Sequence, residues 1–383
     1  MALDPTLTHN LRTTIEHVVE NEFWSIAANL KYQRFTKRMA TDTLSQIFTH
    51  RVAGAILEDY GETGGGIRYE DAVIASQEFR NHYVKSGFRL PEGEFKDFAR
   101  KGIQLASEWG QDVGYAGAYW PQKRGIQVLR NGTSTYMITE NGNLIKLLCY
   151  DGLSLFNNAH PYNFKRPSLG VFTNIASNAN TVATQPKFLP LGGPFVKNSG
   201  TGVWEYNSAL GNVDAVSNDD ALNNLFLMIA HVQSIRMPDG ITPRNLEPTL
   251  ITHGPKLLNK VLTLTSAEFI NSSVGSREIK ATITKLGLSD PCNLLELQNT
   301  GTVNEDWDWY AFCEPQIARS RFGAICYGEL EPFQLYMFAA TSGSEGVNLK
   351  LAEDNEVRWI TQGRNLVGPG MPHLVFKSQA PRS

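Results

Sequence analysis

The segment between residues 67 and 88 constrains the fold most, because it is long and carries no continuous apolar face. Its sequence, IRYEDAVIASQEFRNHYVKSGF, mixes β-branched and aromatic residues with charges, and its apolar positions follow neither the helical nor the strand period. The glycine-rich tract GETGGG at 61–66 precedes it. In an isolated monomer, extended chain of this kind buries little surface. We therefore expect it to be mobile or to be stabilised by another molecule.

The rest of the chain is apolar enough to form a large core. The sequence has 383 residues, 42% of them hydrophobic and 19% charged, which is typical of a folded protein with two or three domains. A net charge of -3 provides no general attraction to nucleic acid or anionic lipid. The cysteines form no C-x-x-C pair, which argues against a disulfide framework or zinc site and favours a reducing compartment. They are Cys149, Cys292, Cys313 and Cys326.

The sequence also argues against export and against a membrane partner. Its first residues, MALDPTLTHNLRTTIEHVVENEF, lack the basic region and apolar run of a secretory signal. No stretch reaches the roughly 18 consecutive apolar residues of a membrane span. We expect a protein that is made in a cytoplasm and stays in water.

Helical periodicity predicts an amphipathic N-terminal helix over about 10–38, with Asn10 or Thr8 as its N-cap. A long helix is expected within 93–119, where aromatic and aliphatic residues recur at helical offsets. Pro121 is interpreted as the first residue of a separate helix, PQKRGIQVLRNG, because proline suits that position.

The middle of the chain alternates between turns and regular elements. Asn141-Gly142, between two short apolar runs, predicts a tight hairpin. The stretch 151–218 is rich in Asn, Ser, Gly and Pro, and we expect an irregular connection there. Asp219 or Asp220 then caps a clear amphipathic helix, ALNNLFLMIAHVQSIR.

The last third of the chain is rich in strands. TLIT at 249–252 predicts a strand, and Pro255 marks the start of the next helix. From Asn293 onward we expect the strands NLLELQ, WDWYAFC, FGAICYG, QLYMF, VNLKLA, EVRWIT and HLVFKS.

The common catalytic motifs are absent. The glycines of 64–66 are not followed by the Lys-Ser/Thr of a phosphate-binding loop. The serines of TSGSEG at 341–346 are out of register for a nucleophile elbow, and His17 does not begin an H-E-x-x-H zinc helix. These features are interpreted as a hinge, a surface turn and a solvated helix residue.

Two clusters nevertheless resemble catalytic sites. Cys149, Asp151 and His160 supply a thiol, a carboxylate and an imidazole, so a Cys-dependent hydrolase is one hypothesis. A tight Asp-Gly turn followed by a His-Pro anchor explains the same residues, and we favour it because catalytic partners usually come from distant parts of a chain.

The run EDWDWYAF places Asp306 and Asp308 on one strand face and Trp307 and Trp309 on the other. Paired carboxylates beside tryptophans are found in sugar-cleaving grooves. A half-buried strand with Trp inside and Asp in water explains them more simply. We therefore expect no enzyme, no catalytic residue, no metal site and no cofactor, and favour a structural or interaction protein.

Three collinear stretches resemble the Mu-type major head subunit family of tailed bacteriophages. CYDGLSLFNNAHP at 149–161 is similar to that family's C-Y-D-G-x-x-x-F-x-x-x-H-P signature. Residues 74–98 resemble its extended-loop region leading into a long helix, and 225–269 resemble its helix, strand turn and following helix. The terminal HLVFKS is similar to the closing strand of phage capsid proteins. The stretch 163–218 is interpreted as an insertion or a divergent region.

The resemblance implies an α+β fold, the tailed-phage major capsid fold. Its parts map onto an N-terminal arm at 1–46, an extended loop at 47–93 and a peripheral domain with a long spine helix at 94–160. An axial domain with insertions is expected at 161–350, and C-terminal strands at 351–383 return to the peripheral domain.

The function implied is that of a major capsid protein, which self-assembles into hexamers and pentamers of an icosahedral shell around phage double-stranded DNA. Its partners are then other copies of itself, a scaffolding protein, a portal and non-specifically held DNA. The protein is expected in the virion, after assembly in the cytoplasm of a bacterial host. An encapsulin-like compartment shell is the alternative with the same fold. The expected contacts between subunits are Arg34, Arg38, Arg68, Glu70, Arg80 and Lys85.

Overall fold

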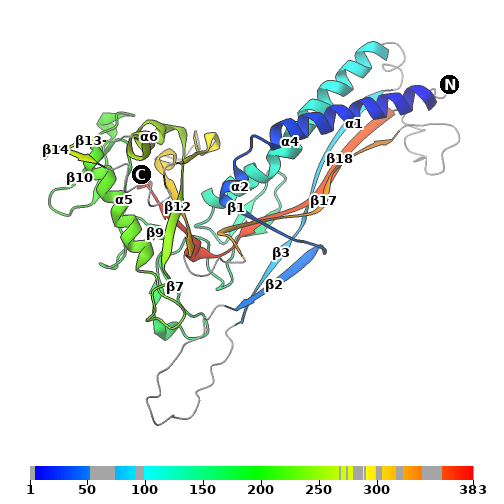
Figure 1. The fold of residues 1–383 in the computed structure, drawn as a ribbon. Coiled ribbons are helices and arrows are strands. Elements are labelled where there is room, and N and C mark those ends of the chain that lie inside the picture. Colours follow the sequence, from blue (N-terminus) through cyan, green and yellow to red (C-terminus); the bar gives the residue numbers. More distant parts are fainter. Residues whose placement is uncertain are drawn as a thin grey trace, which may run out of the picture.

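The chain forms an elongated lobe and a compact lobe (Figure 1). The elongated lobe contains the helices α1 (Pro5–Ala27) and α4 (Ala99–Arg130), and the compact lobe contains the helix α5 (Asn218–Gln233) and the strand β12 (Leu246–His253). The C-terminus lies in the compact lobe, and the N-terminal end of α1 lies at the far end of the elongated lobe. The computed structural model describes residues 5–51, 74–91, 99–266, 269–272, 275–278, 288, 290–298, 304–315, 322–338 and 356–382.

A four-stranded sheet runs along the elongated lobe. Its strands, in spatial order, are β1 (Thr36–Met39), β17 (Ile325–Phe338), β18 (Glu356–Pro369) and β4 (His82–Pro91). The pair β1 and β17 is parallel and the other pairs are antiparallel. Helix α4 covers one face, where the Phe88 ring stacks on Trp109 at 5.7 Å and also contacts the fully buried Trp359. Aromatic residues from three elements therefore join the helix to the sheet.

Helix α1 packs along α4 in the same direction, and two glycines allow the close approach. Gly110 faces Ile15, and Gly114 faces the α1 backbone one turn further on. A Cβ atom on Gly114 would lie 2.7 Å from the carbonyl oxygen of Val19, a distance that side chains do not tolerate. The glycines that weaken the helix locally are thus explained by helix packing.

The N-terminal helix does not span the predicted 10–38, since it begins at Pro5, before both predicted caps, Thr8 and Asn10. It ends at Ala27, and a short helix α2 (Tyr32–Phe35) leads directly into β1. Thr36 begins this strand and pairs with Ile325 of β17. Sheet pairing with a distant segment overrides the helical pattern here, because single-sequence periodicity carries no information about such a partner.

The prediction of a helix break at Pro121 is wrong, since α4 continues through it to Arg130. An internal proline costs a helix about 3 kcal/mol because it removes a hydrogen bond. Beyond the proline, Ile126 is 2% exposed and Leu129 is fully buried in the core of the chain. Burial of these side chains offsets the cost and keeps the helix continuous.

The compact lobe is built on a five-stranded sheet. Its strands, in spatial order, are β15 (Cys292–Asn293), β12, β16 (Trp309–Pro315), β19 (Val375–Ser378) and β9 (Ile175–Ala176). Helix α5 packs on β12 through its apolar face, and α6 (Leu258–Ser266) lies beside α5. The predicted closing strand HLVFKS is confirmed in part as β19, with its first residues in a short 3-10 helix, and it lies inside the sheet between β16 and β9.

Both lobes also contain short hairpins. The predicted Asn141-Gly142 hairpin is confirmed as β5 (Tyr136–Ile138) and β6 (Leu144–Lys146), with Gly142 in the left-handed region at φ 76°. The other short strands are β7 (His160–Pro161), β8 (Val171–Phe172), β10 (Phe195–Lys197), β11 (Trp204–Tyr206), β13 (Phe269–Ser272) and β14 (Gly275–Glu278). The stretch 151–218 is mostly irregular, as predicted.

Three local predictions need correction. The cap of α5 is Ser217, whose hydroxyl accepts a hydrogen bond from the Asp220 amide, so neither predicted aspartate is the cap. Within the segment NLLELQ, Leu295–Leu297 form a 3-10 helix and not the predicted strand. The strand β15, which ends at Asn293, pairs with β12 over two residues only. FGAICYG and QLYMF form the single strand β17, whose register shifts between Glu329 and Gln334. The predicted strand VNLKLA lies outside the described residues.

Candidate functional site

A two-stranded ribbon projects from the body of the protein (Figure 1). Strands β2 (Ser45–Arg51) and β3 (Ile74–Arg80) pair with each other and belong to no larger sheet. At its base, Phe48 contacts the buried ring of Phe79 at 5.6 Å. The inner face of the ribbon packs on the body of its own chain, where Phe48 lies 5.8 Å from Phe322 and Gln77 Nε2 donates to the carbonyl oxygens of Leu148 and Pro369. On the outer face Ile47 is 65% exposed.

The predicted contact residue Arg80 lies on this ribbon and is largely exposed. Its Nε donates to Glu78 Oε1 at 3.0 Å, and the hydroxyl of Ser45 donates to the same oxygen at 2.6 Å. These two hydrogen bonds, with Ser45 the stronger cause, lower the pKa of Glu78. Arg68 and Glu70, the two other predicted residues of this region, lie outside the described residues.

The two predicted arginines of the arm have different surroundings. Arg34 forms an ion pair with Asp290 at 2.8 Å and also donates to the main-chain oxygen of that residue. Arg38 is 76% exposed and lies 3.5 Å from Glu329. Arg34 therefore fastens the arm to its own chain, whereas the guanidinium of Arg38 remains accessible.

Lys85, the last predicted contact, lies on the face of the four-stranded sheet opposite α4. Its ammonium stands 4.5 Å from the ring centre of Tyr83, and the guanidinium of Arg364 lies 4.1 Å from the same ring. Arg364 also forms an ion pair with Glu331 at 3.1 Å. Both cations and the ring are thus held on one surface of the sheet.

The same surface carries two arginines that sequence reasoning missed. Arg89 alternates with Lys85 along β4, and the register places it directly opposite Arg358 of β18. The strand alternation in HYVKSGFRL and EVRWIT contains this signal, but the pairing of the two strands is needed to bring the cations together. The result is a basic face of the sheet.

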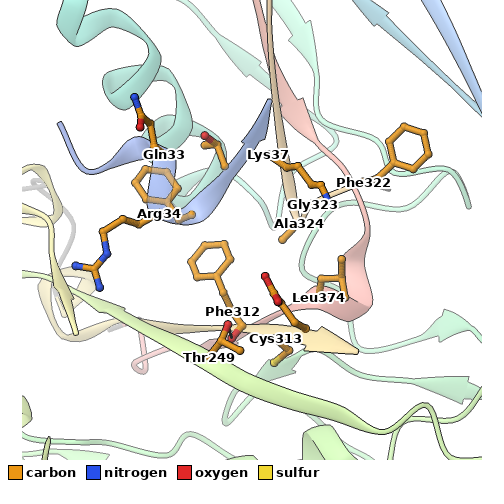
Figure 2. A pocket seen from close by; sticks show the side chains of 13 residues that line it. Gln33, Arg34, Lys37, Thr249, Phe312, Cys313, Phe322, Gly323, Ala324 and Leu374 are labelled. Carbon is orange, nitrogen blue, oxygen red and sulfur yellow. Dashed lines mark hydrogen bonds between the residues drawn. The ribbon is translucent and has the colours of Figure 1, made fainter. Parts of the chain in front are cut away.

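A cavity of about 320 Å³ lies where the arm meets the compact lobe (Figure 2). Phe35 of the arm and Phe312 of β16 face each other across it, with ring centres 6.0 Å apart. Figure 2 shows Arg34 and Lys37 extending in opposite directions from it. The thiol of Cys313 also lines the cavity, and burial raises its pKa, so it is held as an unreactive thiol.

The cluster Cys149, Asp151 and His160 lacks the arrangement of a hydrolase. His160 Nδ1 lies 2.6 Å from Asp151 Oδ2, and both side chains are fully buried. The second ring nitrogen, Nε2, lies 3.3 Å from the carbonyl oxygen of Leu155, so each ring nitrogen already has an oxygen atom as its partner. Burial, with a smaller contribution from Asp151, raises the pKa of the Cys149 thiol well above its usual value. The cluster therefore has a structural role and stabilises the fold.

The acidic-aromatic run is also structural, although two expectations about it are wrong. Glu305–Trp307 form a 3-10 helix and β16 begins at Trp309, so the run does not alternate along one strand. Trp307 and Trp309 are buried as predicted. Asp308 was expected in water, but its side chain is 3% exposed and forms ion pairs with Lys377 and Arg382. The reason is that cations of the C-terminal segment lie beside the buried carboxylate and pair with its charge.

Two further features are absent from the part of the chain that the structure describes. There, no group of three or more His, Cys, Asp or Glu side chains is placed to hold a metal ion. No helix of these residues is long and apolar enough to cross a membrane.

No protein-family model and no curated protein sequence matches the chain. Among solved structures, it is similar to the capsid of Myoviridae phage XM1, at 9% sequence identity and a TM-score of 0.47, over 91% of this chain and 89% of that chain. It is similar to the capsid of bacteriophage JBD30 decorated with minor capsid protein trimers, at 9% identity and a TM-score of 0.41 over 91% of this chain; it spans only 63% of that chain. A third similar structure is the virus-like particle from Pyrococcus furiosus, at 11% identity and a TM-score of 0.40, over 94% and 97% of the two chains.

Proposed function

We propose that the chain is a shell-forming major capsid protein of a tailed bacteriophage with an α+β capsid fold. Its hexamers and pentamers build an icosahedral shell that encloses double-stranded DNA. The observation that carries this proposal is the β2–β3 ribbon, which joins no larger sheet and leaves an apolar residue, Ile47, exposed on its outer face. Neighbouring copies in a closed shell would cover this face.

The resemblance of residues 149–161 to a capsid-family signature supports the same proposal. Its Asp and His positions, Asp151 and His160, form the buried pair described above. This pair joins the two ends of the loop between the residues, so both residues have a structural role.

The domain assignment is part of the proposal. We assign the N-terminal arm to 1–46, the extended loop to 47–93 and the peripheral domain, with α4 as its spine helix, to 94–160. The axial domain within 161–350 is built on the five-stranded sheet, and 351–383 includes the returning strand β18. Strand β17 falls within 161–350, but it belongs to the four-stranded sheet, so we place it with the peripheral domain.

The proposed partners follow from a shell. They are other copies of this chain, a scaffolding protein and a portal, and the packaged DNA. The net charge of -3 suits a container that holds DNA without binding it tightly. A cellular compartment shell would use the same contacts, and the contents of purified particles separate the two: packaged DNA supports the phage capsid, whereas an enzyme cargo supports the compartment.

The ribbon provides the direct test. Ile47, the exposed apolar residue of the ribbon, is replaced by Asp, and particles are sought by electron microscopy after expression with and without a candidate scaffold. The full chain is expected to give shells, tubes or capsomer rings, and the variant to stay dispersed while it keeps its melting temperature. A matched control replaces the exposed β10–β11 turn at 199–202 and is expected to assemble. Equal assembly of the variant and the full chain would contradict the role of the ribbon.

A further inference from the structure

Two loops lie side by side at the end of the compact lobe that contains β7 (Figure 1). The first loop, 162–170, joins β7 to β8, and the second, 236–243, lies between α5 and β12. They touch at Gly240, where a Cβ atom would lie 2.6 Å from the main-chain oxygen of Leu169 and 3.3 Å from its Cβ atom. Only a glycine allows this approach. The exposed side chains of the two loops therefore belong to one surface.

The second loop is held by its own polar contacts. Asp239 Oδ1 accepts hydrogen bonds from the amides of Ile241 and Thr242 at 2.8 Å and 2.9 Å, and Oδ2 accepts one from the Thr242 hydroxyl. The guanidinium of Arg236 donates to the carbonyl oxygen of Gly240 at 2.9 Å. The side chain of Ile241 takes part in none of these bonds, so the loop keeps its shape without it. A loop that is already ordered loses little conformational entropy when it binds a partner.

The surface of the two loops carries exposed apolar side chains. Of the large apolar side chains that the structure describes, Ile241 is the most exposed, at 78%, and Leu169 of the first loop is 38% exposed. Single exposed apolar side chains are common on proteins and need no explanation. Here two of them lie on adjoining loops, one of which is fixed by its own hydrogen bonds, and such a pair can anchor a partner.

The same loops carry an excess of positive charge, although the net charge of the chain is -3. Lys165 and Arg166 are exposed on the first loop, and Arg236 is exposed on the second. Burial raises the pKa of Tyr162 in the first loop, and the nearby charge of Arg236 opposes this rise. Within the described residues no carboxylate forms an ion pair with any of the three cations. Asp239 is the one acidic residue of the two loops, and it is engaged in the hydrogen bonds given above.

The combination of cations with aliphatic side chains favours a protein partner over a nucleic acid. Phosphate groups would pair with the cations, but single-stranded nucleic acids also stack their bases on aromatic rings. Ile241 and Leu169 are aliphatic and provide no ring for stacking. Carboxylate side chains next to an apolar one match both parts of the surface, the cations and the aliphatic pair.

We propose that this surface docks an acidic segment of a partner protein, and that the segment carries an apolar side chain. The carboxylates of the segment pair with Lys165, Arg166 and Arg236, and its apolar side chain packs against Ile241 and Leu169. This docking is separate from the contacts between copies in a shell.

The experiment is a calorimetric titration of the dispersed full chain, at low salt, with a synthetic peptide that repeats Glu-Glu-Leu-Leu. One control peptide repeats Glu-Glu-Gln-Gln and lacks apolar side chains, and the other repeats Lys-Lys-Leu-Leu and has the opposite charge. Saturable binding of the first peptide is expected, about tenfold or more weaker without its leucines and absent with the opposite charge. No saturable binding of the first peptide, or equal binding of either control, would overturn the proposal.

A single-stranded oligothymidylate tests the nucleic-acid alternative in the same titration. Its phosphates pair with the cations but leave the aliphatic pair uncovered, so it is expected to bind more weakly than the Glu-Glu-Leu-Leu peptide. Binding of the oligonucleotide as tightly as the peptide would assign the surface to nucleic acid and would overturn the proposal.

Variants locate the binding. Ile241→Ser is expected to weaken peptide binding about tenfold, and Lys165→Glu combined with Arg166→Glu is expected to abolish it, because like charges repel. Both variants change exposed side chains, so the melting temperature is expected to stay unchanged. Ile138→Ser and Lys197→Glu, at exposed positions of β5 and β10, are the matched controls and are expected to bind as the unmodified chain does. Unchanged affinity in either loop variant would overturn the proposal.

The assembly of Ile241→Ser distinguishes a partner protein from a second copy of the chain. This variant is expected to form particles as the unmodified chain does, because the surface is assigned to a different protein. Loss of particles in Ile241→Ser would assign the surface to contacts between copies and would overturn the proposal. Failure of the peptide to bind would remove the docking site and leave the evidence from the ribbon unchanged, so the two proposals fail separately.

Discussion

The ammonium of Lys377 lies 3.1 Å from Asp308 Oδ2 in the interior of the compact lobe, where both side chains are almost fully buried. Arg382 forms a second ion pair with the same carboxylate at 2.5 Å. The rings of Phe156 and Tyr310 flank the ammonium at 5.6 Å and 5.5 Å. This arrangement fastens the C-terminal strand β19 and the residues after it to β16.

Replacement of Asp308 by Asn is expected to lower the free energy of unfolding by about 3 to 5 kcal/mol, because it leaves the charge of Lys377 buried without its partner. Lys377→Met is expected to cost less, since Asp308 keeps Arg382. Urea unfolding of the two variants measures the difference. A larger loss in Lys377→Met than in Asp308→Asn would contradict this account of the pair.

The thiols provide a test of the non-enzymatic interpretation. All four cysteines are buried and free, and burial raises the pKa of Cys149 and of Cys313. The native chain is therefore expected to react slowly with an aromatic disulfide reagent and to release all its thiols only after unfolding. One rapidly reacting thiol that disappears in Cys149→Ser would revive the hydrolase hypothesis.

The contact between α1 and α4 predicts opposite effects at two glycines. A methyl group at Gly114 would meet the backbone oxygen of Val19, so Gly114→Ala is expected to lower the free energy of unfolding by about 1 to 3 kcal/mol. At Gly110 the nearest atom is a side-chain methyl of Ile15 at 3.3 Å, which can move. Gly110→Ala is therefore expected to be neutral or to stabilise the helix by up to about 1 kcal/mol. Chemical denaturation checks both, and equal losses at the two sites would be inconsistent with this packing.

Buried histidines predict a loss of stability in mild acid. Burial, assisted by the nearby charge of Lys31, lowers the pKa of His253 below its ordinary value of 6.5, and its Nδ1 bonds to the carbonyl of Gly254 at 2.8 Å. The unfolded chain therefore binds this proton more readily, and the stabilising contribution, present above pH 6.5, is lost as the pH falls below it.

We expect the free energy of unfolding to fall between about pH 7.5 and about pH 5.5, and His253→Gln to reduce the slope. His231, whose pKa is also lowered by burial, contributes to the same slope, so the reduction is partial. An identical slope in His253→Gln and the unmodified chain would contradict this assignment.

Local signals predicted the elements that depend on few residues. Asn141-Gly142 marked its hairpin because the turn requires a left-handed residue, which Gly142 supplies. The irregular stretch 151–218 was evident from its turn-forming residues. The errors at Thr36 and Pro121 have one cause, since distant partners decide both. Thr36 becomes a strand because Ile325 lies beside it, and the helix passes Pro121 because the side chains beyond it are buried.

The residues of the candidate site could likewise be predicted only where no distant partner decides their surroundings. Arg38, Arg80 and Lys85 were expected on the surface from their segments, and the structure places them there. Arg89 and Arg358 lie far apart in the sequence, so the basic face emerges only from the pairing of β4 with β18. The burial of Asp308 was equally hidden, because its cationic partners follow about seventy residues later in the chain.

The mass of the purified full chain, measured by light scattering over a range of concentrations with and without a candidate scaffold, tests the central claim most directly. The account predicts particles of many copies, which electron microscopy resolves as shells, tubes or capsomer rings. A species that stays at the 42.6 kDa of one chain under all these conditions would contradict it.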